Sequence, residues 1–189
     1  MKVIIHFIFI LFLFNACSTT PISNRKSFIL IPMSQEIALG KQAYKSALQD
    51  KNDSGSINLT TLLRKVGNRI VKVSHMPKLD WQFRLIDSKE QNAFALPGGK
   101  VAVYTGMLEI CKNEAGLATV LSHEIAHVIA RHGAQRMSQQ LVLTGALMGA
   151  SLSLKNSTQR NIIMSALGLG VLYGITLPFS RGDEREADQ

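Results

Sequence analysis

The chain has 189 residues, 46% of them hydrophobic, so it is long enough for one domain with a hydrophobic core. Its formal net charge is +8, yet the lysines and arginines are scattered, with no basic block and no accompanying row of aromatic residues. This pattern argues against nucleic-acid binding, and a cationic surface near anionic membranes explains the charge more simply.

The first 17 residues are typical of a targeting segment, with a positive start and an apolar run over residues 3–14 that is too short to span a bilayer comfortably. The run ends at a small residue followed by Cys17, which resembles a bacterial lipobox, in which the cysteine is lipidated and becomes the mature N-terminus. Phe14 stands where leucine is usual, and an ordinary secretory signal is the alternative. We expect a lipid anchor on Cys17, and Ser18 favours the outer membrane.

Residues 18–33 are polar and then mixed in character, which predicts a tether. Two helices are expected after it, over about 34–49 and 60–74, because apolar residues recur there at helical spacing. A loop rich in Asp, Asn, Ser and Gly separates them. We assign no chemistry to these two helices, which are expected to form the scaffold.

Three short strands are predicted next, over residues 81–87, 92–96 and 100–104, as a small β-meander with a Pro-Gly-Gly turn before the last strand. An exposed edge strand can hold an extended peptide through main-chain hydrogen bonds. The alternative is that the meander only covers the core. The candidate substrate-binding residues are Asn92, Ala93, Phe94 and Ala95.

The run over residues 113–137 predicts one long helix, with Asn113 as its N-cap and the sequence HEIAH at residues 123–127. Histidines at i and i+4 lie about 40° apart around a helix, so both imidazoles can converge on one ion. Glu124 lies to the side, where it can take a proton from a water on that ion. H-E-x-x-H on a helix is the zinc-hydrolase pattern, and the alternative is a helix that carries two histidines by accident.

A catalytic zinc site uses three protein ligands, so a third is needed. His132 is expected to face away, because it lies about half a turn around the predicted continuous helix from His123. The acidic segment at 183–188 fits better, since Glu184 and Asp188 share a face of a helix. One carboxylate can bind the metal while the other accepts a hydrogen bond from a ligand histidine. The alternative is a solvated acidic end.

Two apolar stretches, at 141–154 and 162–179, stand between the histidine motif and the acidic segment. The first is too short to span a membrane, and the second is at the threshold but is diluted by small residues and stopped by Pro178. We expect buried or membrane-apposed helices here. A hairpin that dips into lipid is the alternative.

Three segments together resemble the zinc metalloproteases of the HtpX, Ste-type CAAX protease and Oma kind, peptidase family forty-eight of the metallopeptidases. They are residues 92–99, 123–132 and 177–188, and residues 35–40 also match, so the resemblance covers most of the chain. With the lipobox-like end, the sequence resembles the periplasmic BepA/LoiP-like lipoprotein members.

The resemblance implies an α+β domain of the gluzincin (zincin-like) type over residues 34–189, mostly helical, with the small β-meander before the zinc-binding helix. It also implies one zinc ion, a catalytic residue and a supporting residue. The implied site consists of His123, His127 and Glu184 as zinc ligands, Glu124 as the catalytic base and Asp188 as the supporting residue. Family members continue past the last matching segment, so we expect that C-terminal helices are missing from this chain.

The sequence therefore predicts a zinc-dependent endopeptidase that acts in protein quality control on the periplasmic side of the bacterial outer membrane. The expected partners are polypeptide substrates, either misfolded or outer-membrane proteins, and the membrane itself through the lipid anchor on Cys17; nucleic acid is not expected. One alternative is a zinc-bound envelope chaperone or assembly factor with little turnover. Another is an inactive truncated fragment.

Overall fold

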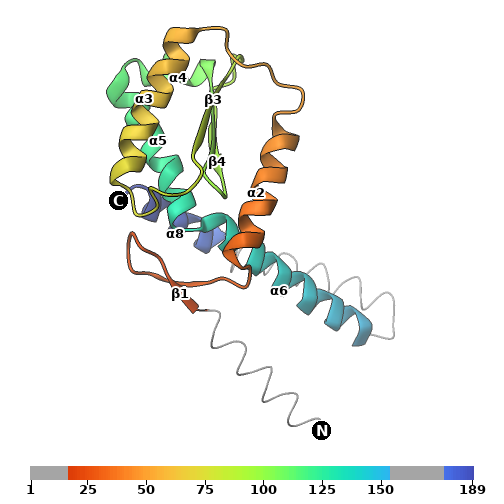
Figure 1. Cartoon of the computed structure of the whole chain (residues 1–189). Helices are drawn as coiled ribbons and strands as arrows, with labels where there is room; N and C mark the ends of the chain where they lie inside the picture. Colours follow the sequence, from red (N-terminus) through yellow and green to blue (C-terminus); the bar gives the residue numbers. More distant parts are fainter. Residues whose placement is uncertain (1–16, 154–176) are drawn as a thin grey trace.

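The computed structural model describes residues 17–153 and 177–189. A three-stranded sheet lies between two layers of helices, as Figure 1 shows. The strands are β3 (Gln82–Ile86), β4 (Ala93–Leu96) and β5 (Lys100–Tyr104). Helix α2 (Met33–Ala47) covers one face, and α3 (Ile57–Val73) and α5 (Glu114–Ile129) cover the other. The remaining helices are α4 (Thr105–Cys111), α6 (His132–Ser153) and α8 (Leu177–Ala187).

The strand order is β3-β5-β4, so the predicted meander is wrong. β5 pairs parallel with β3, with Gln82 opposite Lys100, and antiparallel with β4, with Ala93 opposite Val103. β5 takes the centre because it is buried along its whole length, whereas β4 is only half-buried at the edge. The chain therefore goes from β3 to the edge strand β4 and then returns, after the Pro-Gly-Gly turn, to form β5 between the two.

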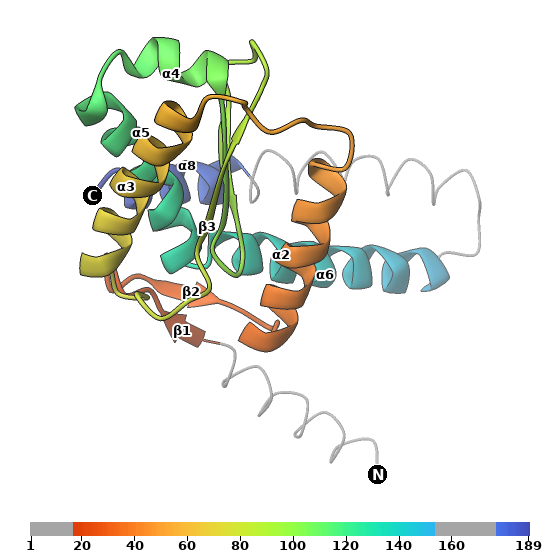
Figure 2. The ribbon, with the colours of Figure 1, turned by 45° about the horizontal axis from the view of Figure 1, so that its top comes forward.

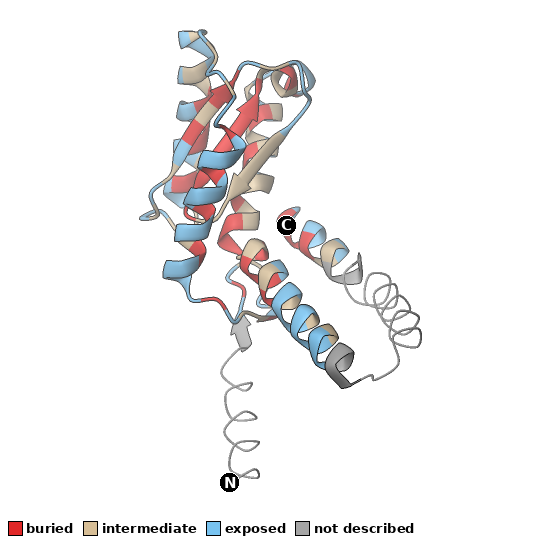
Figure 3. Ribbon diagram, turned by 90° about the vertical axis from the view of Figure 1, so that its right-hand side faces the viewer, coloured by how far each residue is buried: buried red, intermediate tan, exposed pale blue. Residues whose placement is uncertain are grey.

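Hydrophobic clusters on both faces hold the helices against the sheet. The larger cluster joins α3, α4 and α5 to the sheet, and its most deeply buried members include Leu63, Leu85, Val101, Val103, Leu117, Leu121 and Ile125. The smaller cluster lies under α2, where Tyr44 and Leu48 cover Ile86, Ala102 and Tyr104. Figure 3 shows this buried layer between the helices and the sheet. Alternate residues of β5 thus face opposite helix layers, and α5 is fixed beside β4.

Side-chain caps start two of the helices where local sequence rules place them. The Asn113 side chain accepts a hydrogen bond from the Gly116 N–H at 2.9 Å, which confirms the predicted start of α5. Ser56 accepts one from the Leu59 N–H at 3.4 Å, so α3 begins a few residues earlier than predicted. These caps fix the entry of the chain into the two helices that pack on the same face of the sheet.

The predicted continuous helix over residues 113–137 is wrong, because a turn at Arg131 separates α5 from α6. Arg131 has a φ of 58°, a left-handed conformation that costs a non-glycine residue about 1–2 kcal/mol. Two contacts of its guanidinium compensate: it donates to Glu36 Oε2 at 2.8 Å and to the Ile31 carbonyl at 3.0 Å. Both partners come from the N-terminal part of the chain, so no local pattern reveals the break.

Residues 18–33, expected to be a tether, contain a β-hairpin that packs on the domain (Figure 2). β1 (Cys17–Thr19) pairs antiparallel with β2 (Lys26–Phe28), and β2 lies against α6. Just after β2, the Leu30 N–H donates to the Ser138 hydroxyl on α6 at 2.9 Å. The described residues that precede α2 are therefore packed on the domain and do not form a free tether.

Two predictions fall outside the described residues, namely the targeting segment before Cys17 and most of the second apolar stretch, at residues 162–176. Within residues 17–153 and 177–189, no helix is long and apolar enough to cross a membrane. The first apolar stretch lies in α6, where Leu141, Val142 and Met148 are exposed.

Candidate metal centre

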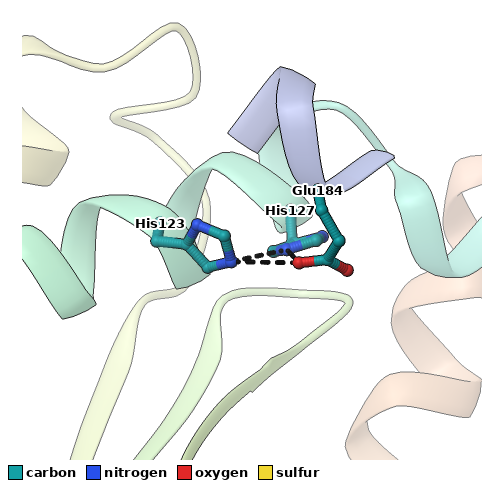
Figure 4. A group of neighbouring side chains, drawn as sticks. All are labelled: His123, His127 and Glu184. Atoms are coloured by element: carbon teal, nitrogen blue, oxygen red, sulfur yellow. Dashed lines mark hydrogen bonds and ion pairs between the residues drawn. The ribbon is translucent and has the colours of Figure 1, made fainter. Parts of the chain in front are cut away.

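The structure brings His123, His127 and Glu184 together, as Figure 4 shows. Both histidines project from α5, and Glu184 projects from α8, which packs against α5. His123 Nε2 and His127 Nε2 are 3.1 Å apart. Glu184 Oε2 lies 3.3 Å from the first of these nitrogens and 3.5 Å from the second. Three potential ligand atoms therefore converge on one point.

The separations of these atoms fit a single zinc ion. Zinc bonds to nitrogen and oxygen are about 2.0–2.2 Å long, and tetrahedral geometry then places neighbouring ligand atoms roughly 3.3 Å apart. Two imidazoles and a carboxylate are also a donor set of catalytic zinc sites, in which the fourth position stays open for water or substrate. Both the geometry and the chemistry of the donors therefore suit zinc.

Each of the three side chains is held by a further contact on its other polar atom. Such contacts orient metal-binding side chains and set the tautomer of a histidine. The three contacts are His123 Nδ1 to Asp188 Oδ1 at 2.9 Å, His127 Nδ1 to His132 Nδ1 at 2.8 Å, and Arg136 Nη2 to Glu184 Oε1 at 3.3 Å. The contact of Asp188 with a histidine is the one that the sequence predicted for one of the two helical carboxylates.

The expectation that His132 faces away from the site is wrong, because it assumed a continuous helix. The turn at Arg131 brings His132 back beside His127, where its side chain is buried. His132 is not a member of the potential ligand group found among the described residues. It meets the Nδ1 atom of His127, whereas the ligand group gathers at Nε2. His132 therefore contacts a potential ligand and does not belong to the ligand group itself.

Glu124 lies next to the ligand group, on the same helix. Burial raises the pKa of its carboxyl, and the charge of Glu184 adds to the effect, while His123 and a hydrogen bond from the Ala95 N–H at 3.2 Å act to lower it. A carboxylate with a raised pKa is a better proton acceptor near neutral pH. Burial and the neighbouring histidines lower the pKa of His127, which favours the neutral imidazole that metals bind.

The edge strand β4 runs beside the ligand group. The Ala95 N–H points toward Glu124, away from β5, whereas the Asn92 carbonyl accepts a hydrogen bond from the Tyr104 N–H on the sheet side at 3.0 Å. Main-chain groups alternate between the two sides of a strand, so Ala93 and Ala95 direct theirs to the open edge and Phe94 directs its own to β5. Only two of the four predicted substrate-binding residues thus offer main-chain groups at that edge.

Two hollows lie along this edge, and both are lined in part by His123 and Glu124. One has a volume of about 350 Å³ and is also lined by Leu96, Pro97 and Arg136. The other has a volume of about 680 Å³ and is also lined by Ala93, Met107 and Val120. A chain laid along β4 would therefore have space for side chains on both sides of the ligand group.

The fold and the site are those of a protein that can hold one metal ion next to a proton acceptor and an open strand. The chain belongs to peptidase family M48, whose sequence pattern matches residues 58–189, so the predicted family is confirmed.

The relatives of this chain include named proteases. It is 38% identical to the mitochondrial metalloendopeptidase OMA1 of Schizosaccharomyces pombe over 93% of this chain and 51% of that protein. It is 32% identical to OMA1 of Saccharomyces cerevisiae over 94% of this chain and 54% of that protein. It is 28% identical to the beta-barrel assembly-enhancing protease of Escherichia coli over 93% of this chain and 37% of that protein. The chain thus spans about half the length of its two yeast relatives.

Proposed function

We propose that this protein is a zinc-dependent endopeptidase of the gluzincin type. His123, His127 and Glu184 bind the metal, and Glu124 is the general base. The observation that carries this proposal is the convergence of three ligand atoms, 3.1–3.5 Å apart, beside a half-buried carboxylate and an open strand. The names of the relatives, metalloendopeptidase and protease, support the same class of reaction.

The reaction follows from the positions of the chain's own residues. An extended polypeptide lies along β4 and bonds to the main chain of Ala93 and to the Ala95 carbonyl, since the Ala95 N–H already donates to Glu124. A bound zinc ion supplies Lewis-acid polarisation of the scissile carbonyl and makes the attacking water more acidic. Glu124 takes a proton from this water as the new C–O bond forms, and passes it to the amide nitrogen as the C–N bond breaks. The raised pKa of Glu124 suits it to both transfers.

The proposal extends to the place of action and the substrates. The targeting segment and the lipobox-like sequence support a lipoprotein of the bacterial envelope, anchored through Cys17 on the periplasmic side of the outer membrane. We propose misfolded or outer-membrane proteins as substrates, and the name of the Escherichia coli relative, beta-barrel assembly-enhancing protease, supports a link to β-barrel proteins. Because β1 begins at Cys17, a lipid on this residue holds the domain close to the membrane surface.

Replacing the general base tests this mechanism. Glu124→Gln keeps the size of the side chain but cannot accept the proton, so we expect the purified protein to retain zinc while casein cleavage falls by about 10²–10⁴-fold. The matched control is Glu114→Gln, the same substitution on the same helix, where exposed ion pairs with Lys65 and Arg69 contribute little. We expect this control to cleave casein at the wild-type rate.

Three outcomes separate the possibilities. Cleavage that persists in Glu124→Gln contradicts the role of this residue, and a wild-type protein without zinc contradicts the site. Zinc binding together with capture of unfolded protein, but without chelator-sensitive cleavage, identifies the chaperone or assembly factor instead.

A further inference from the structure

We propose that Arg25, in the N-terminal hairpin, and His132 are positioning residues of the metal centre. They act through Asp183 and Glu186, which come from the helix that carries Glu184. The inference rests on the proposed function, because it takes the assigned ligands as given. It makes the N-terminal hairpin a part of the centre.

Over residues 180–187, where its side chains are described, helix α8 meets the rest of the domain mainly through charged groups. Its buried members there are Asp183, Glu186 and Ala187. Two of these three are carboxylates, which are costly to bury unless charged partners and hydrogen bonds compensate them. The position of α8, and with it that of Glu184, therefore depends on the groups that meet these two carboxylates.

The N-terminal hairpin supplies the closest of these groups. Arg25 Nη2 donates to Asp183 Oδ1 at 2.6 Å, and its Nε donates to Glu186 Oε2 at 2.9 Å, while both carboxylate side chains are only 2% exposed. The hydroxyls of Thr20 and Ser23 donate to the other oxygen of Glu186. The planar fork of a guanidinium can bridge two carboxylates in this way, whereas the single ammonium of lysine cannot match both directions.

His132 links Glu186 to His127, the second ligand in the network. Its Nε2 lies 3.2 Å from Glu186 Oε2, and its Nδ1 lies 2.8 Å from His127 Nδ1. A carboxylate only accepts, so in neutral His132 the proton is on Nε2 and the lone pair is on Nδ1. His127 Nδ1 is then the donor, which leaves the lone pair of its Nε2 facing His123 and Glu184. That is the tautomer that a metal ligand needs.

A single network, centred on the buried side chains of Asp183, Glu186 and His132, thus reaches two of the three proposed ligands. From Arg25 it passes through Glu186 and His132 to His127, and through Asp183 to the neighbouring Glu184. Loss of Arg25 removes the closest cation from both buried carboxylates and leaves Asp183 with the longer contact to Arg136 Nε at 3.7 Å, so α8 is held less firmly. Changes to groups that hold metal ligands typically weaken metal binding by about 10–100-fold.

The test compares Arg25→Met with Lys26→Met in the purified full chain. Both changes remove one positive charge from the hairpin, but the Lys26 side chain is exposed and outside the network. We expect Arg25→Met to weaken zinc binding by about 10–100-fold, measured by competition with a chromogenic chelator, and to alter the visible spectrum of the cobalt-substituted protein. Lys26→Met should match the wild type in both measurements.

A second pair of variants examines His132. Phe in its place removes both ring nitrogens, whereas Asn keeps an acceptor near the position of Nδ1 and can still meet His127. We expect His132→Phe to lose zinc affinity by about 10–100-fold and His132→Asn to recover part of it. A general loss of stability is controlled by Leu48→Ala, which removes packing from the smaller cluster under α2, a cluster whose named members include no residue of α5 or α8, and should leave zinc affinity unchanged in the folded protein.

The outcomes are distinct. A folded Arg25→Met protein with wild-type zinc affinity and cobalt spectrum overturns the inference, even if the protein cleaves casein. If Arg25→Met does not fold, Arg25→Lys is measured instead. Reduced zinc affinity supports the bridging role of the Arg25 guanidinium, and unchanged zinc affinity overturns the inference. A wild-type protein that binds no zinc overturns the proposed function itself, before any variant is compared.

Discussion

The three proposed ligands differ in how firmly their outer contacts hold them. The side chains of Asp188 and Arg136 are 70% and 53% exposed, so solvent weakens their contacts with the ligands. The side chain of His132 is only 2% exposed, so its contact with His127 is shielded from water. Of the three residues that contact the proposed ligands, His132 is therefore expected to contribute most to holding its ligand in position.

Tyr44 offers a test of burial at the residue scale. Its hydroxyl donates to the Val101 carbonyl at 3.0 Å, and burial raises its pKa from 10.0 to about 12. A group whose pKa is higher in the folded chain stabilises the fold below its ordinary pKa and loses that contribution as the pH rises. We expect the wild type to be more stable than Tyr44→Phe by about 0.5–1.5 kcal/mol at neutral pH, with the difference shrinking between pH 10 and about 12.

Urea unfolding of the two proteins at neutral pH and at about pH 11 measures this change. Phenylalanine has no ionisable group, so the comparison removes the contribution of all other titrating residues. A stability difference that stays constant over this range would contradict the assignment.

At the scale of elements, α2 positions the turn that follows β4. A Cβ on Gly40 would lie 2.1 Å from the Pro97 carbonyl oxygen, whereas one on Gly145, in α6, would meet nothing within 4 Å. We expect Gly40→Ala to destabilise the protein by about 1–3 kcal/mol or more, because α2 or the turn must shift. Gly145→Ala should instead stabilise it by up to about 1 kcal/mol, because alanine favours the helix.

Thermal unfolding of the two variants beside the wild type checks the opposite signs. Pro97 also lines a hollow beside the ligand group, so Gly40→Ala should reduce casein cleavage as well. Similar unfolding temperatures for the two variants would mean that α2 does not pack tightly on the turn.

At the scale of the whole molecule, the hairpin that begins at Cys17 connects the proposed membrane anchor to the candidate metal centre. We expect Cys17→Ala to abolish labelling with radioactive palmitate and to release the protein from the membrane fraction. Zinc affinity should be unchanged, because β1 pairs through its main chain.

The control for this change is the second cysteine. Cys111 is buried and free, so Cys111→Ala should keep both the label and the membrane attachment. Labelling that persists in Cys17→Ala would refute the lipid anchor.

The sequence by itself determined the features that depend on residues a few positions apart. Helical spacing alone places His123 beside His127, and Glu184 on the same face as Asp188. The cap at Asn113 is equally local. These signals also carried the family resemblance, because the matching segments are short and continuous.

Only the tertiary structure decided the rest, because it depends on contacts between distant parts of the chain. The central place of β5 follows from packing on both of its faces, and the turn at Arg131 depends on Glu36. Arg25 finds its partners on α8, near the other end of the sequence. Periodicity and spacing report on neighbours along the chain, so they pointed to the three residues that the fold brings together but not to the buried groups that contact them.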